Sequence, residues 1–134
     1  MVSTKELLEI ARKAALSAYA PYSNFRVGAA LACADGSVIT GVNVENRSFG
    51  MTNCAERSAV FAAISAGKRE FSAIAIACID ADYPVSPCGA CRQVLSEFAG
   101  KDFPVCFAGK KGGVIETTLG ELYPYDALHE LKNS

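Results

Sequence analysis

The stretch Pro87-Cys88-Gly89-Ala90-Cys91 constrains this chain more than any other part of the sequence. Its two cysteines stand three residues apart, and residues 92–98 come next with apolar side chains at helical spacing. Because proline suits the first position of a helix, we expect a helix to begin within this stretch. Residues i and i+3 share one face of a helix, so both sulfurs can reach a single metal ion.

A second segment, Cys54-Ala55-Glu56-Arg57, supplies a third cysteine. It opens a predicted helix over Ala55–Ala66, and Gly67 is a common type of residue after a helix end. Three cysteines plus one open position form the ligand set of a catalytic zinc site, whereas a closed structural site requires four protein ligands. Glu56 is too close to Cys54 along the chain to point the same way on a helix. We therefore expect its carboxyl group beside the metal rather than on it.

Charge is the second requirement of such a site. Three thiolates leave a bound zinc ion with a net negative charge, which weakens it as a Lewis acid. The positive N-terminal ends of the two predicted helices can offset this charge. Arg57 can add a full positive charge and donate a hydrogen bond to a sulfur, although a surface ion pair is its alternative. Glu56 would act as a general base and then a general acid, and its alternative is an ordinary first-turn glutamate.

Length and composition limit the possible classes. The chain has 134 residues, 51% of them hydrophobic, which suffices for one domain over residues 1–134 with a sizeable core. The net charge is −1 and the basic residues are scattered, so the basic stripe of a polynucleotide-binding protein is absent. No apolar run approaches a membrane span, and charged residues near the N-terminus argue against a signal peptide. We therefore expect a cytoplasmic protein whose C-x-x-C motif indicates metal or redox chemistry.

Hydrophobic periodicity predicts an α/β protein, a three-layer α/β/α sandwich around a mixed sheet of roughly five strands. Asp35-Gly36 indicates a hairpin turn. The predicted helices cover Thr4–Tyr19, Ala55–Ala66, the Cys88 stretch to Phe98 and Leu119–Leu122, with a weakly helical tail at Asp126–Leu131. The predicted strands cover Arg26–Ala34, Ser37–Val44, Ser72–Ile79, Phe103–Ala108 and Val114–Thr117.

The remaining cysteines and the single histidine are not predicted to bind metal. Cys33, Cys78 and Cys106 lie inside predicted strands, where small buried side chains are expected. His129 lies in a polar tail. Two other functions compete with a catalytic zinc site. A thiol oxidoreductase would use the C-x-x-C pair but give the Cys54 segment no role, and a non-enzymatic zinc module would need a fourth ligand.

The cysteine and glutamate spacing matches the signature of zinc-dependent deaminases in its three-cysteine form. Three further stretches narrow the resemblance: Ala20–Leu31, Gly41–Asn46 and Cys91–Val94. Together, in this order and over nearly the whole chain, they resemble the small homotetrameric cytidine deaminases. The resemblance implies one Zn²⁺ per subunit and a nucleoside substrate, with no nucleic-acid or membrane partner.

The resemblance also implies roles for particular residues. Cys54, Cys88 and Cys91 would hold zinc with water as the fourth ligand, and Glu56 would shuttle protons. The implied substrate contacts are Asn43 and Glu45 on the ribose hydroxyls, Phe25 against the pyrimidine, and the backbone around Ala55 on the ring carbonyl. Without the resemblance, Phe25 would be interpreted as a core aromatic, and Asn43 and Glu45 as ordinary polar residues at a strand end.

The implied reaction is hydrolytic deamination of cytidine and 2′-deoxycytidine to uridine and 2′-deoxyuridine, with release of ammonia, in pyrimidine salvage. A related deaminase of a blasticidin-type antibiotic is the alternative, but the stretch Asn43–Asn46 favours ordinary nucleosides. The carboxylate of Glu45 beside the sugar would repel phosphates and so favour free nucleosides. Tyr125 and Phe49 are the candidates for an aromatic side chain that reaches a neighbouring subunit.

Overall fold

A mixed five-stranded sheet in the order β2-β1-β3-β4-β5 forms the centre of the computed structural model, which describes residues 2–128 and 131. Only β3 and β4 pair in parallel, and the other neighbours are antiparallel. The prediction of an α/β fold with five strands is confirmed. The strands are β1 Val27–Cys33, β2 Val38–Val42, β3 Phe71–Cys78, β4 Pro104–Ala108 and β5 Val114–Thr118. The helices are α1 Thr4–Ala15, the 3₁₀ helix η1 Phe49–Met51, α2 Ala55–Ser65, α3 Gly89–Phe98 and α4 Leu119–Leu122.

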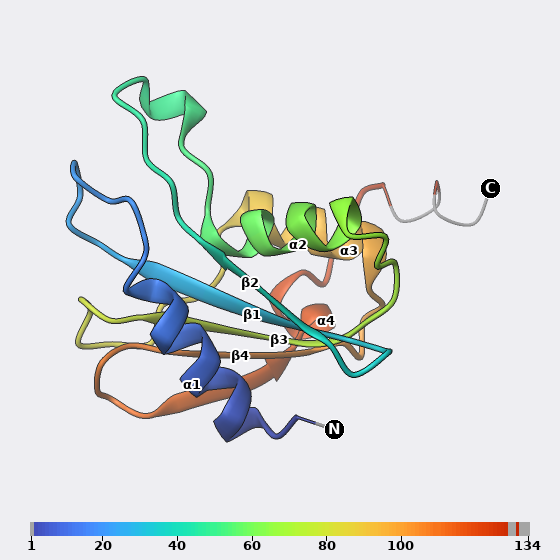
Figure 1. The fold of residues 1–134 in the computed structure, drawn as a ribbon. Coiled ribbons are helices and arrows are strands. Elements are labelled where there is room, and N and C mark those ends of the chain that lie inside the picture. The colour runs from blue at the N-terminus through green and yellow to red at the C-terminus, as the bar shows by residue number, and fades with distance from the viewer. Residues whose placement is uncertain (1, 129–130, 132–134) are drawn as a thin grey trace.

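Helices cover both faces of the sheet, with α1 on one face and α2 and α3 on the other (Figure 1). On the α1 face, the side chains of the sheet are mostly small, among them Ala30 and Ala75. Leu7 and Leu8 of α1 pack against them. The opposite face carries larger side chains, among them Leu31, which packs with residues of α2 and α3. Because β1 and β3 are buried on both faces, their sequences are nearly continuous apolar runs.

Two glycines set the distance between the helices and the sheet. A Cβ atom on Gly28 would lie 2.1 Å from the carbonyl oxygen of Ala11 in α1. A Cβ atom on Gly41 would lie 2.3 Å from the amide nitrogen of Ala59 in α2. No side chain fits at either position, so each helix rests on the backbone of the sheet. The position of the α2 N-terminus therefore depends on this close approach.

Helix α1 is shorter than predicted, because it ends at Ala15 rather than at Tyr19. The backbone of Tyr19 pairs instead with the chain just after β2. Its N–H donates to the Asn43 carbonyl at 3.0 Å, and its carbonyl accepts from the Glu45 N–H at 2.8 Å. The apolar spacing continues past Ala15, but these long-range bonds determine where the helix stops.

The segment between β2 and α2 leaves the sheet as a loop that is closed at its base. Val44 and Asn53 exchange both backbone hydrogen bonds, each 3.0 Å long. The intervening residues 45–52 project beyond the sheet next to the loop at residues 20–24 (Figure 1). Cys54 comes directly after this closure, so its position is fixed by the backbone pair.

The C-terminal tail is described only in part. Ala127 and Leu128 form a turn, where the Leu128 N–H donates to the Asp126 carboxylate at 3.1 Å. His129 lies outside the described residues, so its exclusion from the metal site stays a prediction. Within the described part of the chain, no helix has the length and apolar character to cross a membrane.

We expect Gly41→Ala to destabilise the fold by about 3 kcal/mol, because its methyl group would overlap backbone atoms of α2 rather than a movable side chain. The midpoint of denaturant unfolding measures this loss. Gly100→Ala is the matched control, since no atom lies within 4 Å of the added Cβ. Equal midpoints for the two variants would contradict the close approach of α2.

Candidate active site

The N-termini of α2 and α3 bring three cysteines together. Cys54 is the N-cap residue of α2, Cys88 is the N-cap residue of α3, and Cys91 lies in the first turn of α3. The Sγ atoms of Cys54 and Cys88 are 3.7 Å apart, and those of Cys88 and Cys91 are 3.2 Å apart. All three sulfurs lie within 4.8 Å of one another. The three cysteines selected from the sequence therefore form one cluster.

The start of α3 differs from the prediction in one detail. Cys88 caps the helix, and its sulfur accepts a hydrogen bond from the Cys91 N–H at 3.4 Å. Pro87 therefore precedes the cap and does not occupy the first helical position. The proline correctly indicated a helix start in this stretch, but the cysteine takes the capping role that serine or aspartate usually fills.

The cluster fits a tetrahedral zinc ion. Two sulfurs each bound to zinc at about 2.3 Å lie about 3.8 Å apart at a tetrahedral angle, close to the distance between Cys54 and Cys88. Within the described residues the cluster offers three ligands, so a tetrahedral ion keeps one position for water or substrate. The remaining cysteines, Cys33, Cys78 and Cys106, are buried in strands as predicted.

Positive charge surrounds the sulfurs. Arg57 Nη2 donates to the Sγ of Cys54 at 3.3 Å, and this bond raises the arginine pKa. The hydrogen bond with Cys91, and further ones with Arg57 and Cys88, lower the pKa of the Cys54 thiol, whereas the bond to Cys54 and burial raise the pKa of Cys91. Arg57 Nε is buried without a hydrogen-bond partner in the described structure, so the guanidinium retains donor capacity for a fully ionised cluster. The dipoles of α2 and α3 also direct their positive ends here.

Glu56 is a buried carboxyl group beside the cluster. Only 5% of the residue is exposed, although it belongs to the first turn of α2. Burial raises its pKa to about 7, and the negative charge on Cys54 adds to this effect. A group with a pKa near the working pH can both accept and donate a proton efficiently. Its burial excludes the alternative of an ordinary surface glutamate at a helix start.

A cavity of about 350 Å³ opens next to the cluster, within the usual range for a small-molecule site. Every residue that the sequence suggested for substrate contact lines this cavity: Phe25, Asn43, Glu45 and Ala55. Cys54, Glu56 and Cys88 line the same cavity.

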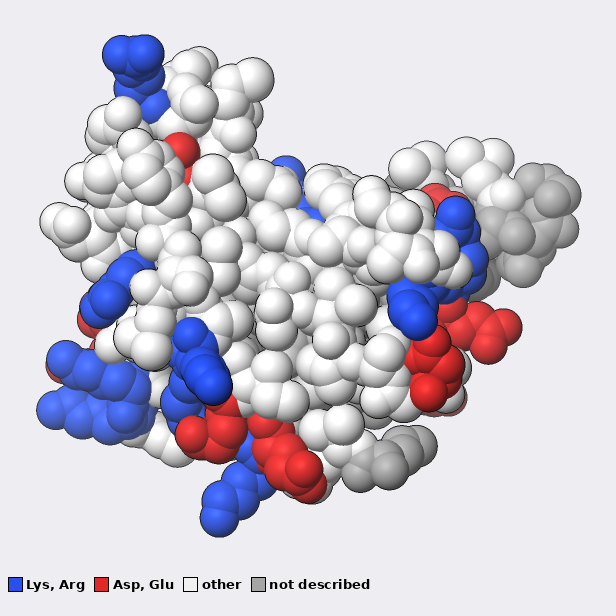
Figure 2. All heavy atoms as spheres, in the orientation of Figure 1, with Lys and Arg blue, Asp and Glu red and all other residues white. Residues whose placement is uncertain are grey.

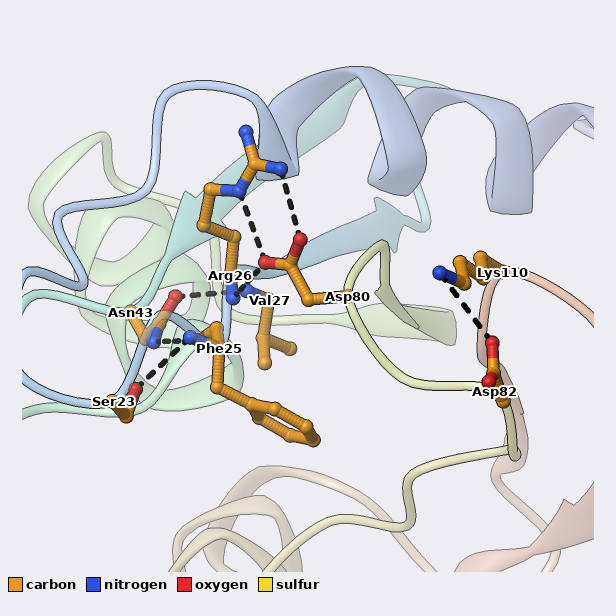
Figure 3. A network of polar contacts seen from close by, with 8 residues as sticks. All are labelled: Ser23, Phe25, Arg26, Val27, Asn43, Asp80, Asp82 and Lys110. Carbon is orange, nitrogen blue, oxygen red and sulfur yellow. Dashed lines mark hydrogen bonds and ion pairs between the residues drawn. The ribbon is translucent and has the colours of Figure 1, made fainter.

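Asn43 and Glu45 are tied to the neighbouring loop. The side-chain amide of Asn43 donates to the Phe25 carbonyl and accepts from the Val27 N–H, both at 2.8 Å (Figure 3). The Glu45 carboxylate accepts from the Tyr22 and Ser23 N–H groups at 3.0 and 3.1 Å, and also from the Ser23 hydroxyl. The Ser23 bonds lower the pKa of Glu45. Both side chains are therefore structural elements of the cavity wall as well as candidate binding groups.

Sequence reasoning missed part of the cavity wall. Thr52, Val85 and Ser86 line it, although they lie in segments predicted only as connecting loops. The available signal was their proximity to Cys54 and Cys88. Arg92 holds this wall, because its Nε donates to the Pro87 carbonyl at 2.8 Å and its Nη1 to the Leu122 carbonyl at 2.7 Å.

Charged side chains of both signs are present on one face of the molecule (Figure 2). On the face in Figure 2, acidic and basic side chains of the described residues alternate along the lower edge, and the projecting loops above are mostly uncharged. Phe49 and Tyr125, the candidates for contact with a neighbour, are 74% and 92% exposed.

A family model described as the cytidine and deoxycytidylate deaminase zinc-binding region matches residues 1–107. The chain belongs to the cytidine deaminase family. It is 48% identical over 123 residues to a cytidine deaminase of Sporosarcina psychrophila, covering 92% of this chain and 90% of the relative. It is 51% identical over 118 residues to a cytidine deaminase of Halalkalibacterium halodurans, covering 88% and 89%.

Solved structures agree with the family assignment. The crystal structure of cytidine deaminase from Burkholderia pseudomallei is 48% identical in sequence and has a TM-score of 0.87, and the match covers 91% of this chain and 97% of that one.

Blasticidin-S deaminase from Bacillus cereus is a more distant relative, 33% identical over 132 residues, covering 89% of this chain and 88% of that protein. This cytidine deaminase family member is an enzyme of the hydrolase class, so a non-enzymatic zinc module and a thiol oxidoreductase are set aside.

We expect Cys91→Ser to reduce bound zinc to below about a tenth of the wild-type content, because two thiolates do not complete the site. Metal analysis of the purified variants measures the zinc-to-protein ratio. Cys78→Ala is the matched control, since this cysteine is equally buried but lies in β3 outside the cluster. Full zinc occupancy in Cys91→Ser would remove Cys91 from the ligand set.

Proposed function

We propose that this protein hydrolyses cytidine and 2′-deoxycytidine to uridine and 2′-deoxyuridine with release of ammonia, a reaction of pyrimidine salvage. The observation that carries the proposal is the buried carboxyl group of Glu56 in one cavity with three clustered cysteine sulfurs. Cys54, Cys88 and Cys91 hold one Zn²⁺ per subunit, which supplies a Lewis acid that lowers the pKa of water.

Glu56 moves the protons of the reaction. It accepts a proton from the attacking water and donates it to N3 of the cytosine ring, while the water oxygen bonds to C4. It then carries the second water proton to the C4 amino group, which leaves as ammonia when the C4–N bond breaks. The carbonyl of uridine forms at C4, and Glu56 returns to its starting state. A carboxyl pKa raised to about 7 supports both directions of transfer.

Phe25 and Ala55 bind the base in this proposal. Phe25 supplies an apolar ring on the cavity wall against the pyrimidine. Ala55 is the first residue of α2, and the first N–H groups of a helix have no partner within the helix. Its N–H therefore suits the ring carbonyl oxygen.

Asn43 and Glu45 bind the ribose hydroxyls. Glu45 Oε1 already accepts from two N–H groups, those of Tyr22 and Ser23. Asn43 Oδ1 and Glu45 Oε2 each accept one hydrogen bond, from the Val27 N–H and the Ser23 hydroxyl, so each keeps a second lone pair. A sugar hydroxyl can donate to that lone pair without breaking the bonds that shape the wall. Glu45 stays ionised at neutral pH, since its hydrogen bonds with Ser23 lower its pKa. A 5′-phosphate nearby would be repelled, so we expect free nucleosides to be preferred over nucleotides.

Deamination of a blasticidin-type cytosine nucleoside is the second candidate. Its support is the relative at 33% identity, which is less similar than the relatives named cytidine deaminase at 48% and 51%. Side-by-side assays of cytidine, 2′-deoxycytidine, cytidine 5′-monophosphate and blasticidin S decide between them. A higher kcat/KM for blasticidin S would overturn the cytidine assignment.

The Glu56→Gln variant is expected to lose at least about a thousandfold in kcat while it keeps its zinc, because glutamine cannot transfer a proton. Loss of the cytidine absorbance band and release of ammonia measure turnover, and metal analysis of the same sample measures zinc. Glu97→Gln, a glutamate on the far end of α3, is the control for charge removal. Substantial turnover by Glu56→Gln would remove Glu56 from the mechanism.

We further propose a homotetramer. Support comes from an exposed apolar surface on the two loops beside the cavity, since large patches of this kind mark interaction sites. Tyr22 and Phe49 meet there edge to face with ring centroids 5.9 Å apart. The apolar residues, each between 47% and 74% exposed, are Leu16, Tyr19, Tyr22, Val44, Phe49 and Met51.

Light scattering of the purified protein is expected to give four times the chain mass, and Phe49→Asp to lower it by placing charge in the contact. Lys5→Asp, a charge change on α1 away from these loops, is the control. A wild-type protein that stays monomeric at micromolar concentration would contradict the assembly.

The location of the protein in the cytoplasm stays a prediction.

A further inference from the structure

Side chains from three separate segments hold the backbone around Phe25 (Figure 3). The Ser23 hydroxyl accepts from the Phe25 N–H at 3.0 Å. The side-chain amide of Asn43 donates to the Phe25 carbonyl and accepts from the Val27 N–H, both at 2.8 Å. Between these bonds, the Asp80 carboxylate accepts from the Arg26 N–H at 2.8 Å. Every peptide group from Phe25 to Val27 is thus held by a side chain at its N–H.

The Asp80 carboxylate accepts hydrogen bonds from both the backbone N–H and the guanidinium group of Arg26. One carboxylate oxygen accepts from both the Arg26 N–H and its Nε, at 2.8 and 3.0 Å. The other oxygen accepts from Nη2 at 2.9 Å. These bonds join the start of β1 to the end of β3 across 54 residues of sequence. The arginine holds the pKa of Asp80 at about 2, so the pair is ionised at neutral pH.

The extended chain that leads into β1 shows what these bonds to Arg26 control. Side chains alternate between the two sides of an extended chain, so Phe25 and Val27 share one side and Arg26 points to the other. Phe25 and Val27 both line the cavity, whereas Arg26 and Asp80 do not. In Figure 3 the Phe25 ring points away from the ion pair. Fixing the Arg26 backbone therefore fixes the direction of the Phe25 ring.

The chain needs this restraint because it turns sharply just before Phe25. Asn24 adopts a left-handed conformation with φ of 56°. Without a fixed point after this turn, the Phe25 backbone could rotate and withdraw its ring from the cavity. The Asp80 carboxylate supplies such a fixed point at the Arg26 N–H, between the points held by the Ser23 and Asn43 side chains.

We propose that Asp80 and Arg26 are positioning residues that hold the Phe25 ring against the bound base and thereby set the affinity for the nucleoside. The assignment of the base to this ring rests on the proposed function. Phe25 carries no charge and transfers no proton, so we expect its contact with the base to be about as strong in the ground state as in the transition state. Loss of such a contact raises KM and leaves kcat unchanged.

The first test is Asp80→Asn, which keeps the side-chain shape and removes the charge. The loss of the charged hydrogen bonds is expected to raise KM for cytidine about tenfold, with kcat within about twofold of wild type. Asp82→Asn is the matched control. Asp82 lies two residues further along the same loop, and its carboxylate forms ion pairs of 3.5 and 3.9 Å with the exposed Lys110 and Lys111 ammonium groups. We therefore expect KM of this variant to stay unchanged.

A double-mutant cycle tests whether Asp80 acts through Phe25. In a Phe25→Ala background, Asp80→Asn is expected to change KM less than about twofold, because no ring remains to be positioned. An equal rise in KM with and without the ring would overturn the proposal. A fall in kcat at unchanged KM would overturn it as well.

Two further measurements keep the test independent of folding defects and of turnover. Arg26→Gln retains the backbone bond to Asp80, so we expect a smaller rise in KM, about threefold. Amide hydrogen exchange at residues 25–27 is expected to speed up in Asp80→Asn and not in Asp82→Asn, and unchanged exchange would overturn the positioning role. If zinc-loaded wild type fails to deaminate cytidine, the proposed function fails, and hydrogen exchange still decides the role of Asp80.

Discussion

The close approach of three cysteine sulfurs is the constraint on which the rest of the structure depends. Thiolates this close repel one another unless positive charge or a cation lies between and around them. The chain meets this requirement with two helix N-termini and one guanidinium, that of Arg57. Both helices must therefore start at the same point in space, although 34 residues separate Cys54 from Cys88. Both helices pack on the same face of the sheet, and this brings their two distant starts to one place.

The topology of the sheet explains how this is done. Strand β3, helix α3 and strand β4 form a parallel crossover, so α3 starts beyond the carboxyl end of β3, where open α/β sheets bind ligands. Helix α2 starts at the same end of the sheet, after the loop that follows β2. Gly41 lets α2 lie directly on the backbone of β2. Asp80 leaves β3 at this same end and fixes the start of β1. The three clustered cysteines, Glu56 and the cavity wall thus lie together at one end of the sheet.

The parts of this arrangement that could be predicted from the sequence are those with a local cause. The C-x-x-C spacing, the apolar runs of β1 and β3 and the glycine after α2 each act within a few residues, and these patterns were enough to predict the cysteine cluster. The predicted end of α1 was wrong because Tyr19 bonds to residues beyond β2, which no local pattern reveals. Val85 and Ser86 were missed for the same reason. The position of their segment depends on Arg92, which donates to the carbonyls of Pro87 and of Leu122 in α4. The Arg26–Asp80 pair joins residues too far apart in sequence for any motif to connect them.

The backbone closure between Val44 and Asn53 has an evolutionary consequence. A loop whose two ends are already joined can lengthen or shorten at little extra entropic cost and without shifting the start of the next helix. Residues 46–51, which lie between the cavity-lining Glu45 and Thr52, can therefore diverge among descendants of this protein while the adjoining cysteine keeps its place. The outer part of the loop and the cysteine cluster are in this way heritable traits that can vary separately.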